Sequence, residues 1–136
     1  MNNQLSPELY RVIDANLNRL KEGIRVVEDI LRYCHNDKIT SKQLKSLRHK
    51  AITDDTKELL TYRDSVNDVL RPSLNSELHR SSECSIVIAN FKRIQESARV
   101  LEELYKLINV TKSELFKSVR YEIYTIEKEV VLKYYP

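Results

Sequence analysis

Glycine is almost absent from this chain of 136 residues, which contains only Gly23. A glycine-rich loop that wraps phosphate groups needs several glycines close together, and a dinucleotide-binding turn needs three. Both kinds of site are therefore excluded. If the protein holds phosphates, it must do so with side chains and with the N-terminal ends of helices.

Cysteine, long apolar runs and an excess of charge are scarce as well. Cys34 and Cys84 are too few for a disulfide framework and too far apart for a zinc knuckle, so we expect buried free thiols in a reducing cytoplasm. No apolar run approaches the roughly 18 residues of a membrane span, and the opening MNNQLSPELY does not resemble a signal peptide. A net charge of +3 is too small to indicate nucleic acid as a partner.

The remaining composition, 41% hydrophobic and 32% charged, is typical of one globular domain over residues 1–136. Apolar residues at heptad spacing, such as Leu17, Phe91 and Ile123, predict an all-α antiparallel bundle of four main helices. The first helix is expected over residues 6–35 and the third over residues 81–108. The second is expected to begin at residue 40, with a weak point at Thr53–Asp55, and the fourth at residue 111. Capping boxes are expected at Thr40–Gln43 and Thr111–Glu114. Residues 63–80 form the one long loop.

A repeat links the first and third helices. Residues 14–33 and 88–107 align without a gap, and seven of the twenty positions are identical. Most identical positions are polar: they are Ala15/Ala89, Asn16/Asn90, Arg19/Arg93, Glu22/Glu96, Arg25/Arg99, Val26/Val100 and Glu28/Glu102. Packing alone would preserve apolar residues, so this repeat indicates more than packing.

In both helices a second stripe runs beside the apolar one and carries the asparagine, the arginine and a small residue, Gly23 or Ser97. A small residue lets another backbone approach closely, so we expect the two helices to pair there with approximate two-fold symmetry. Asn16, Arg19 and their counterparts would then converge. Asparagine is unfavourable inside a helix, so either a structural hydrogen-bond network or a ligand contact is implied.

Charged ladders offer a simpler interpretation of part of the repeat. Arginine and glutamate alternate every three residues, and such pairs stabilise an exposed helix by about 0.2–0.5 kcal/mol each. A solvated surface is the expectation for the residues furthest from the seam: Arg25, Glu28, Arg99 and Glu102. Arg48–His49 is either an exposed basic pair or part of a site, and Arg120, Tyr121 and Tyr124 are expected in the core and at its rim.

Five segments together resemble a known family: DANLNRLKEGIRVVEDILRY, LRH at 47–49, RDSVND at 63–68, ANFKRIQESARVLEEL at 89–104 and RYEIYTIEKE at 120–129. The chain resembles the monofunctional hydroxymethylpyrimidine-phosphate kinases of thiamin biosynthesis, which occur alone or fused to thiamine-phosphate synthase. The family pattern has a glycine where this chain has Leu70, which bears on the conformation of the loop.

The resemblance implies a kinase that uses ATP and Mg²⁺ to convert the pyrimidine phosphate to its diphosphate. The nucleophile is an anionic phosphate oxygen, so catalysis must rest on positioning and on cations. The expected catalytic side chains are Arg19, Arg93, Arg63 and Arg48. Substrate binding is assigned to Asn16, Asn90, Arg80 and His49, and metal binding to Asp14, Glu22, Asp64 and Asp68, although Asp is also common in loops and caps.

Two other functions suit the same residues. A non-catalytic helical module could bind a phosphorylated thiamin intermediate or dock onto thiamine-phosphate synthase. A nucleic-acid binder is disfavoured by the even balance of charge. The heptad seams leave open whether the chain forms a homo-oligomer.

Overall fold

The computed structural model describes residues 5–51 and 56–136. The elements of these residues are α1 (Pro7–Asp29), a π-helical turn (Ile30–Cys34), α2 (Lys38–Lys50), α3 (Thr56–Tyr62), a 3₁₀ turn (Asn75–Leu78), α4 (Glu83–Tyr105) and α5 (Val110–Tyr134). The all-α prediction is confirmed. The predicted weak point at Thr53–Asp55 and the first four residues of the chain lie outside the described residues.

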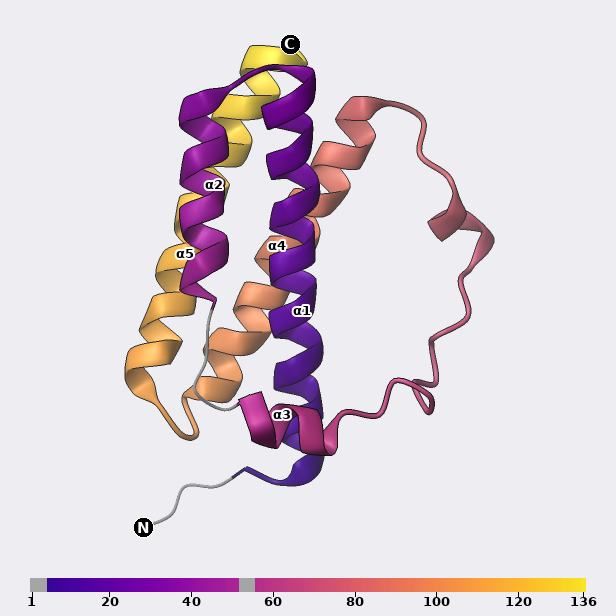
Figure 1. The fold of residues 1–136 in the computed structure, drawn as a ribbon, viewed down its shortest axis with the longest axis vertical. Coiled ribbons are helices and arrows are strands. Elements are labelled where there is room, and N and C mark those ends of the chain that lie inside the picture. The colour runs from indigo at the N-terminus through magenta and orange to yellow at the C-terminus, as the bar shows by residue number, and fades with distance from the viewer. Residues whose placement is uncertain (1–4, 52–55) are drawn as a thin grey trace.

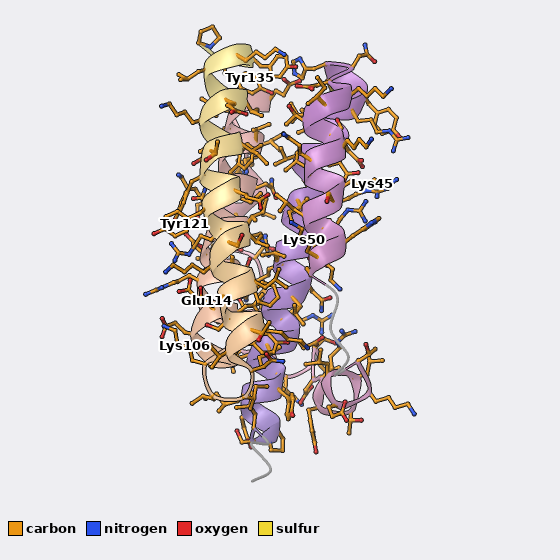
Figure 2. All side chains as sticks on the ribbon, turned by 90° about the vertical axis from the view of Figure 1, so that its left-hand side faces the viewer. Lys45, Lys50, Lys106, Glu114, Tyr121 and Tyr135 are labelled. Carbon is orange, nitrogen blue, oxygen red and sulfur yellow. The ribbon has the colours of Figure 1, made fainter. Side chains whose placement is uncertain are left out.

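The long helices form a bundle in which α1 and α5 run in one direction and α2 and α4 run in the other (Figure 1). α1 and α4 lie side by side, α5 packs against α4, and both α2 and α3 pack against α1. α2 and α5 lie on the same side of the α1–α4 pair (Figures 1 and 2), where an ion pair of 3.8 Å joins Lys50 to Glu122. The loop from α3 to α4 arcs away on the opposite side (Figure 1).

The predicted apolar seams form the core. Leu17, Phe91 and Ile123 are 2% exposed or less, and the residues at heptad spacing around them are similarly buried. Within the described residues, no helix combines the length and the apolar character that crossing a bilayer requires. One face of each long helix is therefore occupied by the other helices of the bundle.

Two helix starts were predicted at the wrong residue. α2 begins at Lys38 because the Asp37 carboxylate caps it, accepting a hydrogen bond of 3.0 Å from the Thr40 amide. α5 begins at Val110 because the Asn109 side chain accepts a bond of 3.1 Å from the Lys112 amide. In both cases an Asp or Asn a few residues earlier caps the helix, and such residues rank above threonine as caps. The third helix was predicted to begin near Ser81 or Ser82, and this is confirmed: Ser82 caps α4, with Ser85 completing a capping box.

The helix ends show further differences. α4 ends at Tyr105 rather than at residue 108, and a tight turn closes it with a hydrogen bond of 2.7 Å from the Asn109 amide to the Tyr105 carbonyl. Both cysteines are free, as predicted, but the prediction that they are buried was wrong. Cys34 is exposed and Cys84 is partly exposed because they lie near the helix ends at one end of the bundle.

The repeat extends beyond α1 and α4. Residues 40–50 of α2 align with residues 112–122 of α5, and four of the eleven positions are identical: Ser41/Ser113, Lys45/Lys117, Ser46/Ser118 and Arg48/Arg120. Each half of the bundle is therefore a helical hairpin built on one pattern, α1–α2 in the first half and α4–α5 in the second.

Candidate functional site

The two hairpins meet where Gly23 faces α4. A Cβ atom at this position would lie 2.9 Å from Ile94 Cγ1 and 3.3 Å from the Asn90 carbonyl oxygen, so the backbones approach closely. Ser97, its counterpart, is buried and donates its hydroxyl to the carbonyls of Arg93 and Ile94 at 2.8 and 3.0 Å. The predicted pairing of the helices at a glycine is confirmed.

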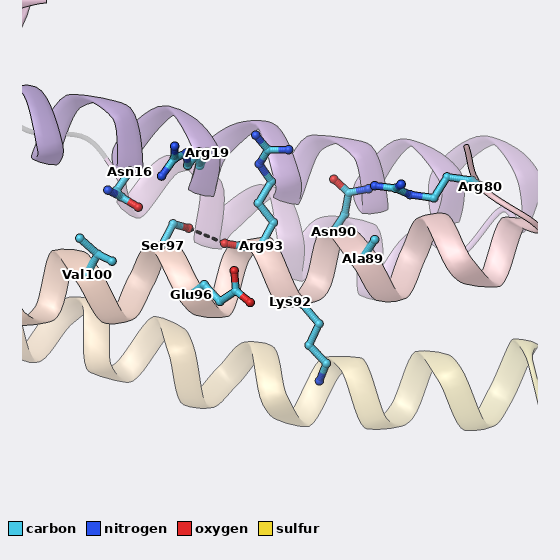
Figure 3. A pocket seen from close by; sticks show the side chains of 10 residues that line it. All are labelled: Asn16, Arg19, Arg80, Ala89, Asn90, Lys92, Arg93, Glu96, Ser97 and Val100. Atoms are coloured by element: carbon cyan, nitrogen blue, oxygen red, sulfur yellow. Dashed lines mark hydrogen bonds between the residues drawn. The ribbon is translucent and has the colours of Figure 1, made fainter. Parts of the chain in front are cut away.

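A cavity of about 440 Å³, the first cavity, opens beside this contact (Figure 3). It brings together five predicted site residues from α1, α4 and the preceding loop: Asn16, Arg19, Arg80, Asn90 and Arg93. Lys92 and Glu96, which sequence reasoning did not single out, also line it. Arg19, Arg80 and Arg93 thus line the cavity together with one carboxylate, whereas Lys92 points toward α5 and binds Glu127 (Figure 3). The cavity is therefore suited to an anion.

Two arginines of this cavity lack the partners that other arginines have. Arg63, Arg99 and Arg120 each form an ion pair with a carboxylate. In the described part of the chain, the guanidinium groups of Arg19 and Arg93 form no hydrogen bond and no ion pair. Within residues 5–51 and 56–136, the side chain of Arg80 bonds only to the adjacent His79 carbonyl, at 3.2 Å, and it extends along α4 toward Asn90 (Figure 3).

The two asparagines share one geometry. Asn16 donates its amide to the Val12 carbonyl and Asn90 to the Ile86 carbonyl, both at 2.8 Å and four residues back. Each therefore satisfies one donor within its own helix. Among the described residues no hydrogen bond reaches either Oδ1 atom, so both amides keep an acceptor at the cavity.

A second cavity of about 540 Å³ adjoins the first, and Asn16 and Arg19 line both. Four more predicted residues line it: Asp14, Arg63, Asp64 and Asp68. Arg63 donates two hydrogen bonds of 2.6 Å to the Asp14 carboxylate, and these bonds raise the pKa of Arg63. The pair ties the start of the long loop to the middle of α1.

The carboxylates of the second cavity differ in how free they are to bind a metal. Asp14 is committed to Arg63, whereas the carboxylates of Asp64 and Asp68 accept hydrogen bonds only from the loop itself among the described residues. Hydrogen bonds from Asn67 hold the pKa of the Asp64 carboxyl below its ordinary value. No group of three His, Cys, Asp or Glu side chains among the described residues is placed to hold a metal. One or two carboxylates suffice for Mg²⁺ when phosphates supply other ligands.

Three predicted site residues lie elsewhere. Arg48 and His49 are on α2, away from both cavities, and the exposed Glu22 lines neither of them. Arg48 instead binds Glu28, with Nε–Oε1 at 3.0 Å and Nη2–Oε2 at 3.3 Å. The roles proposed for these three residues stay predictions.

The expectation that Glu28 and Glu102 are solvated was wrong. Glu28 is 1% exposed and Glu102 5% exposed, because each accepts an arginine from the second helix of its own hairpin. Arg120 reaches Glu102 at 2.8 Å, as Arg48 reaches Glu28. The two glutamates therefore join each hairpin internally, whereas Arg25 and Arg99 remain exposed as predicted.

The loop carrying Leu70 shows no strain. Asn36 is the one non-glycine residue with positive φ in the described ranges, so Leu70 adopts ordinary backbone geometry. Its amide donates to the Asp68 carboxylate at 3.0 Å and its side chain is 84% exposed. Leucine in place of the family glycine is therefore accommodated.

Comparison with known proteins finds one family model, described as the ThiD2 family, which matches residues 11–129. A thiamine-phosphate synthase of Nostoc punctiforme is 35% identical over 132 residues, covering 94% of this chain and 37% of that protein. A thiamine-phosphate synthase of Gloeobacter violaceus is 39% identical over 123 residues, covering 88% of this chain and 35% of that protein. No solved structure matches. This chain spans just over a third of the length of these relatives.

Proposed function

Because this chain belongs to the ThiD2 family, we propose that it is a phosphotransferase of thiamin biosynthesis. Its reaction transfers the γ-phosphoryl group of ATP to 4-amino-5-hydroxymethyl-2-methylpyrimidine phosphate and gives the diphosphate. The similarity to enzymes named thiamine-phosphate synthase supports the pathway. The first and second cavities support the chemistry.

One observation carries the proposal: two unpaired arginines, one from each hairpin, line a single cavity with Arg80. An arginine without a carboxylate keeps its full charge and five donors for a ligand, and its planar fork fits phosphate oxygens. Two polyanions must approach each other in this reaction. Arg19, shared by both cavities, and Arg93 are the side chains that offset their repulsion.

The asparagines and the carboxylates complete the assignment. The acceptor oxygens of Asn16 and Asn90 are suited to the exocyclic amino group of the pyrimidine. Asp64 and Asp68 would hold Mg²⁺, which supplies charge neutralisation to the phosphates. The Asp14–Arg63 pair positions the loop that carries these carboxylates.

The test is incubation of the purified chain with ATP, magnesium and the pyrimidine phosphate, followed by chromatography of the products. We expect the pyrimidine diphosphate and ADP in equal amounts. Repeating the assay with pyrimidine lacking the phosphate separates a strictly second-step kinase from one that acts on both. Absence of both ADP and the pyrimidine diphosphate with every divalent metal tried would rule out the kinase reaction.

A second candidate function rests on the long loop. Val66, Val69 and Leu70 are 74%, 90% and 84% exposed, which is unusual for aliphatic side chains so close together. A non-catalytic module would use this surface to dock onto thiamine-phosphate synthase, or onto a second copy of this chain. Co-migration with purified thiamine-phosphate synthase, without product formation, would favour it over the kinase.

A further inference from the structure

The two helices of the second hairpin form a third cavity, of about 700 Å³, which none of the assignments above uses. α4 contributes Lys92, Gln95 and Arg99 together with Glu96, and α5 contributes Arg120, Tyr121 and Tyr124. Lys92 and Glu96 also line the first cavity, so the two cavities meet across one turn of α4. A ligand can therefore extend from one into the other.

Each cation of the third cavity already has a carboxylate partner. Lys92 binds Glu127 at 3.0 Å, and Arg99 and Arg120 bind Glu102 at 2.9 and 2.8 Å. This differs from the first cavity, where Arg19 and Arg93 have no carboxylate partner in the described ranges. The first cavity is suited to phosphate, and the third to a ligand part without charge.

Aromatic surface is concentrated in the third cavity. Tyr121 and Tyr124 are 55% and 40% exposed, with ring centroids 5.8 Å apart and ring planes at 87°. The Arg120 guanidinium lies 5.0 and 5.8 Å from the two ring centroids and so fixes one side of the pair. Figure 2 shows Tyr121 on the side of α5 away from α2. Exposed, braced aromatic rings are the usual stacking surface for a heterocyclic base.

Polar groups for the edge of a base are present as well. Gln95, 6% exposed, bonds through its amide nitrogen to Glu127 at 3.0 Å, and its Oε1 has only a 3.5 Å contact from Lys92. The Nε–H of Arg120 is buried and has no acceptor among the described residues. A buried donor without a partner is unfavourable, and a ring nitrogen would satisfy it.

We infer that the third cavity binds the base of the nucleotide donor. The triphosphate then crosses α4 between Lys92 and Glu96 and reaches Arg93 in the first cavity. This inference rests on the proposed function for the identity of the ligand as a nucleoside triphosphate. The placement of the base rests on the cavity, on its two exposed rings and on its paired cations.

The experiment compares equilibrium binding of ATP and of inorganic tripolyphosphate, both with magnesium, to the full chain and its variants. Tyr121→Leu and Tyr124→Leu should each weaken ATP binding about tenfold, since one lost stacking contact has about that effect. Both should leave the dissociation constant of tripolyphosphate within twofold of the wild-type value. Tyr33→Leu is the matched control, because Tyr33 is exposed, lies under Arg32 at 5.0 Å and belongs to the π-helical turn that follows α1.

Equal weakening of both ligands, or no change in ATP binding, would overturn the base site. Circular dichroism of each variant excludes unfolding as the cause. ATP binding that depends on the tyrosines, without phosphate transfer, would rule out the kinase reaction and support the base site. Phosphate transfer that continues in both tyrosine variants with an unchanged KM for ATP would rule out the base site and support the kinase reaction.

Discussion

The two hairpins of this bundle share one pattern of helix pairing but differ in several side chains at equivalent positions. In each, a buried glutamate on the first helix accepts an arginine from the second, as Glu28 does from Arg48 and Glu102 from Arg120. Only the first hairpin has the Asp14–Arg63 pair, because Ile88 stands at the position equivalent to Asp14. Only the second has Tyr121, where the first has His49.

This difference indicates how one pattern used twice can serve two unlike ligands. The shared residues Arg19 and Arg93 meet at the contact between the halves, where both ligands would present phosphate. The residues that differ lie further out, at the second and third cavities. Four predictions test this comparison.

The largest effect is expected from the shared arginines. Arg19→Ala and Arg93→Ala should each lower kcat at least about a hundredfold, the usual loss when one preorganised donor to a transition state is removed. Steady-state assays with ATP and the pyrimidine phosphate measure it, and circular dichroism checks helical content. Arg25→Ala, which alters an exposed pair with Asp29, is the control and should keep wild-type turnover. Near-normal rates in both variants would mean that the repeat is structural and the site misplaced.

The two buried glutamates should differ in how much stability is lost when an arginine partner is replaced. Arg48→Met leaves Glu28 buried without a cation, and we expect a loss of about 3 kcal/mol in the free energy of unfolding. Arg120→Met should cost roughly half as much, because Arg99 still reaches Glu102 at 2.9 Å. Urea titrations measure both values. Equal losses would show that Arg99 contributes nothing, and the turnover of folded Arg48→Met tests the catalytic role predicted for Arg48.

The two small residues should also differ. Gly23→Ala places a Cβ 2.9 Å from Ile94 Cγ1, so overpacking should outweigh the gain in helix propensity and cost about 1–2 kcal/mol. Ser97→Ala removes a hydroxyl that bonds only to carbonyls of its own helix, and should change stability by less than about 0.5 kcal/mol. Urea unfolding compares them. A stabilised Gly23→Ala variant would mean that the helices separate easily.

The smallest effect is on acid stability. Burial raises the pKa of Glu102, but bonds from Arg120 and Arg99 outweigh it and hold the pKa below the ordinary 4.5. The unfolded chain therefore takes up this proton first, and the stabilisation is present above about pH 4.5 and lost as pH falls through the folded pKa. Glu102→Gln should flatten the stability profile between pH 6 and pH 3, by less than about 1.4 kcal/mol per pH unit. A profile parallel to the wild type would contradict this.

The sequence was sufficient for the parts of the fold that depend on periodicity. Heptad spacing located the core, including Leu17 and Phe91, because burial follows directly from the helical repeat. It misplaced the starts of α2 and α5, where several potential caps lie close together and local geometry decides. Capping strength at Asp37 and Asn109 depends on backbone angles that composition does not contain.

The candidate site was predictable where the signal was a polar residue at a repeated position. Arg19, Asn16 and their counterparts share one cavity, as the alignment predicted. The burial of Glu28 and Glu102 was not predictable from their own helices, since a ladder at three-residue spacing looks the same on a surface and at an interface. The alignment of Arg48 with Arg120 was the signal that could have revealed it. Tyr121 and Tyr124 carried no repeat and were predicted, with Arg120, to lie in the core and at its rim, whereas both rings are exposed.

The close approach of α1 and α4 at Gly23 has one more consequence. The two hairpins are held together mainly by this single seam, and Arg19 and Arg93 stand on opposite sides of it along one rim. A phosphate group that contacts both arginines would bridge α1 and α4 across this seam. Its binding energy is then added to the cohesion of the halves, so substrate would act as a structural part of the protein for as long as it stays bound.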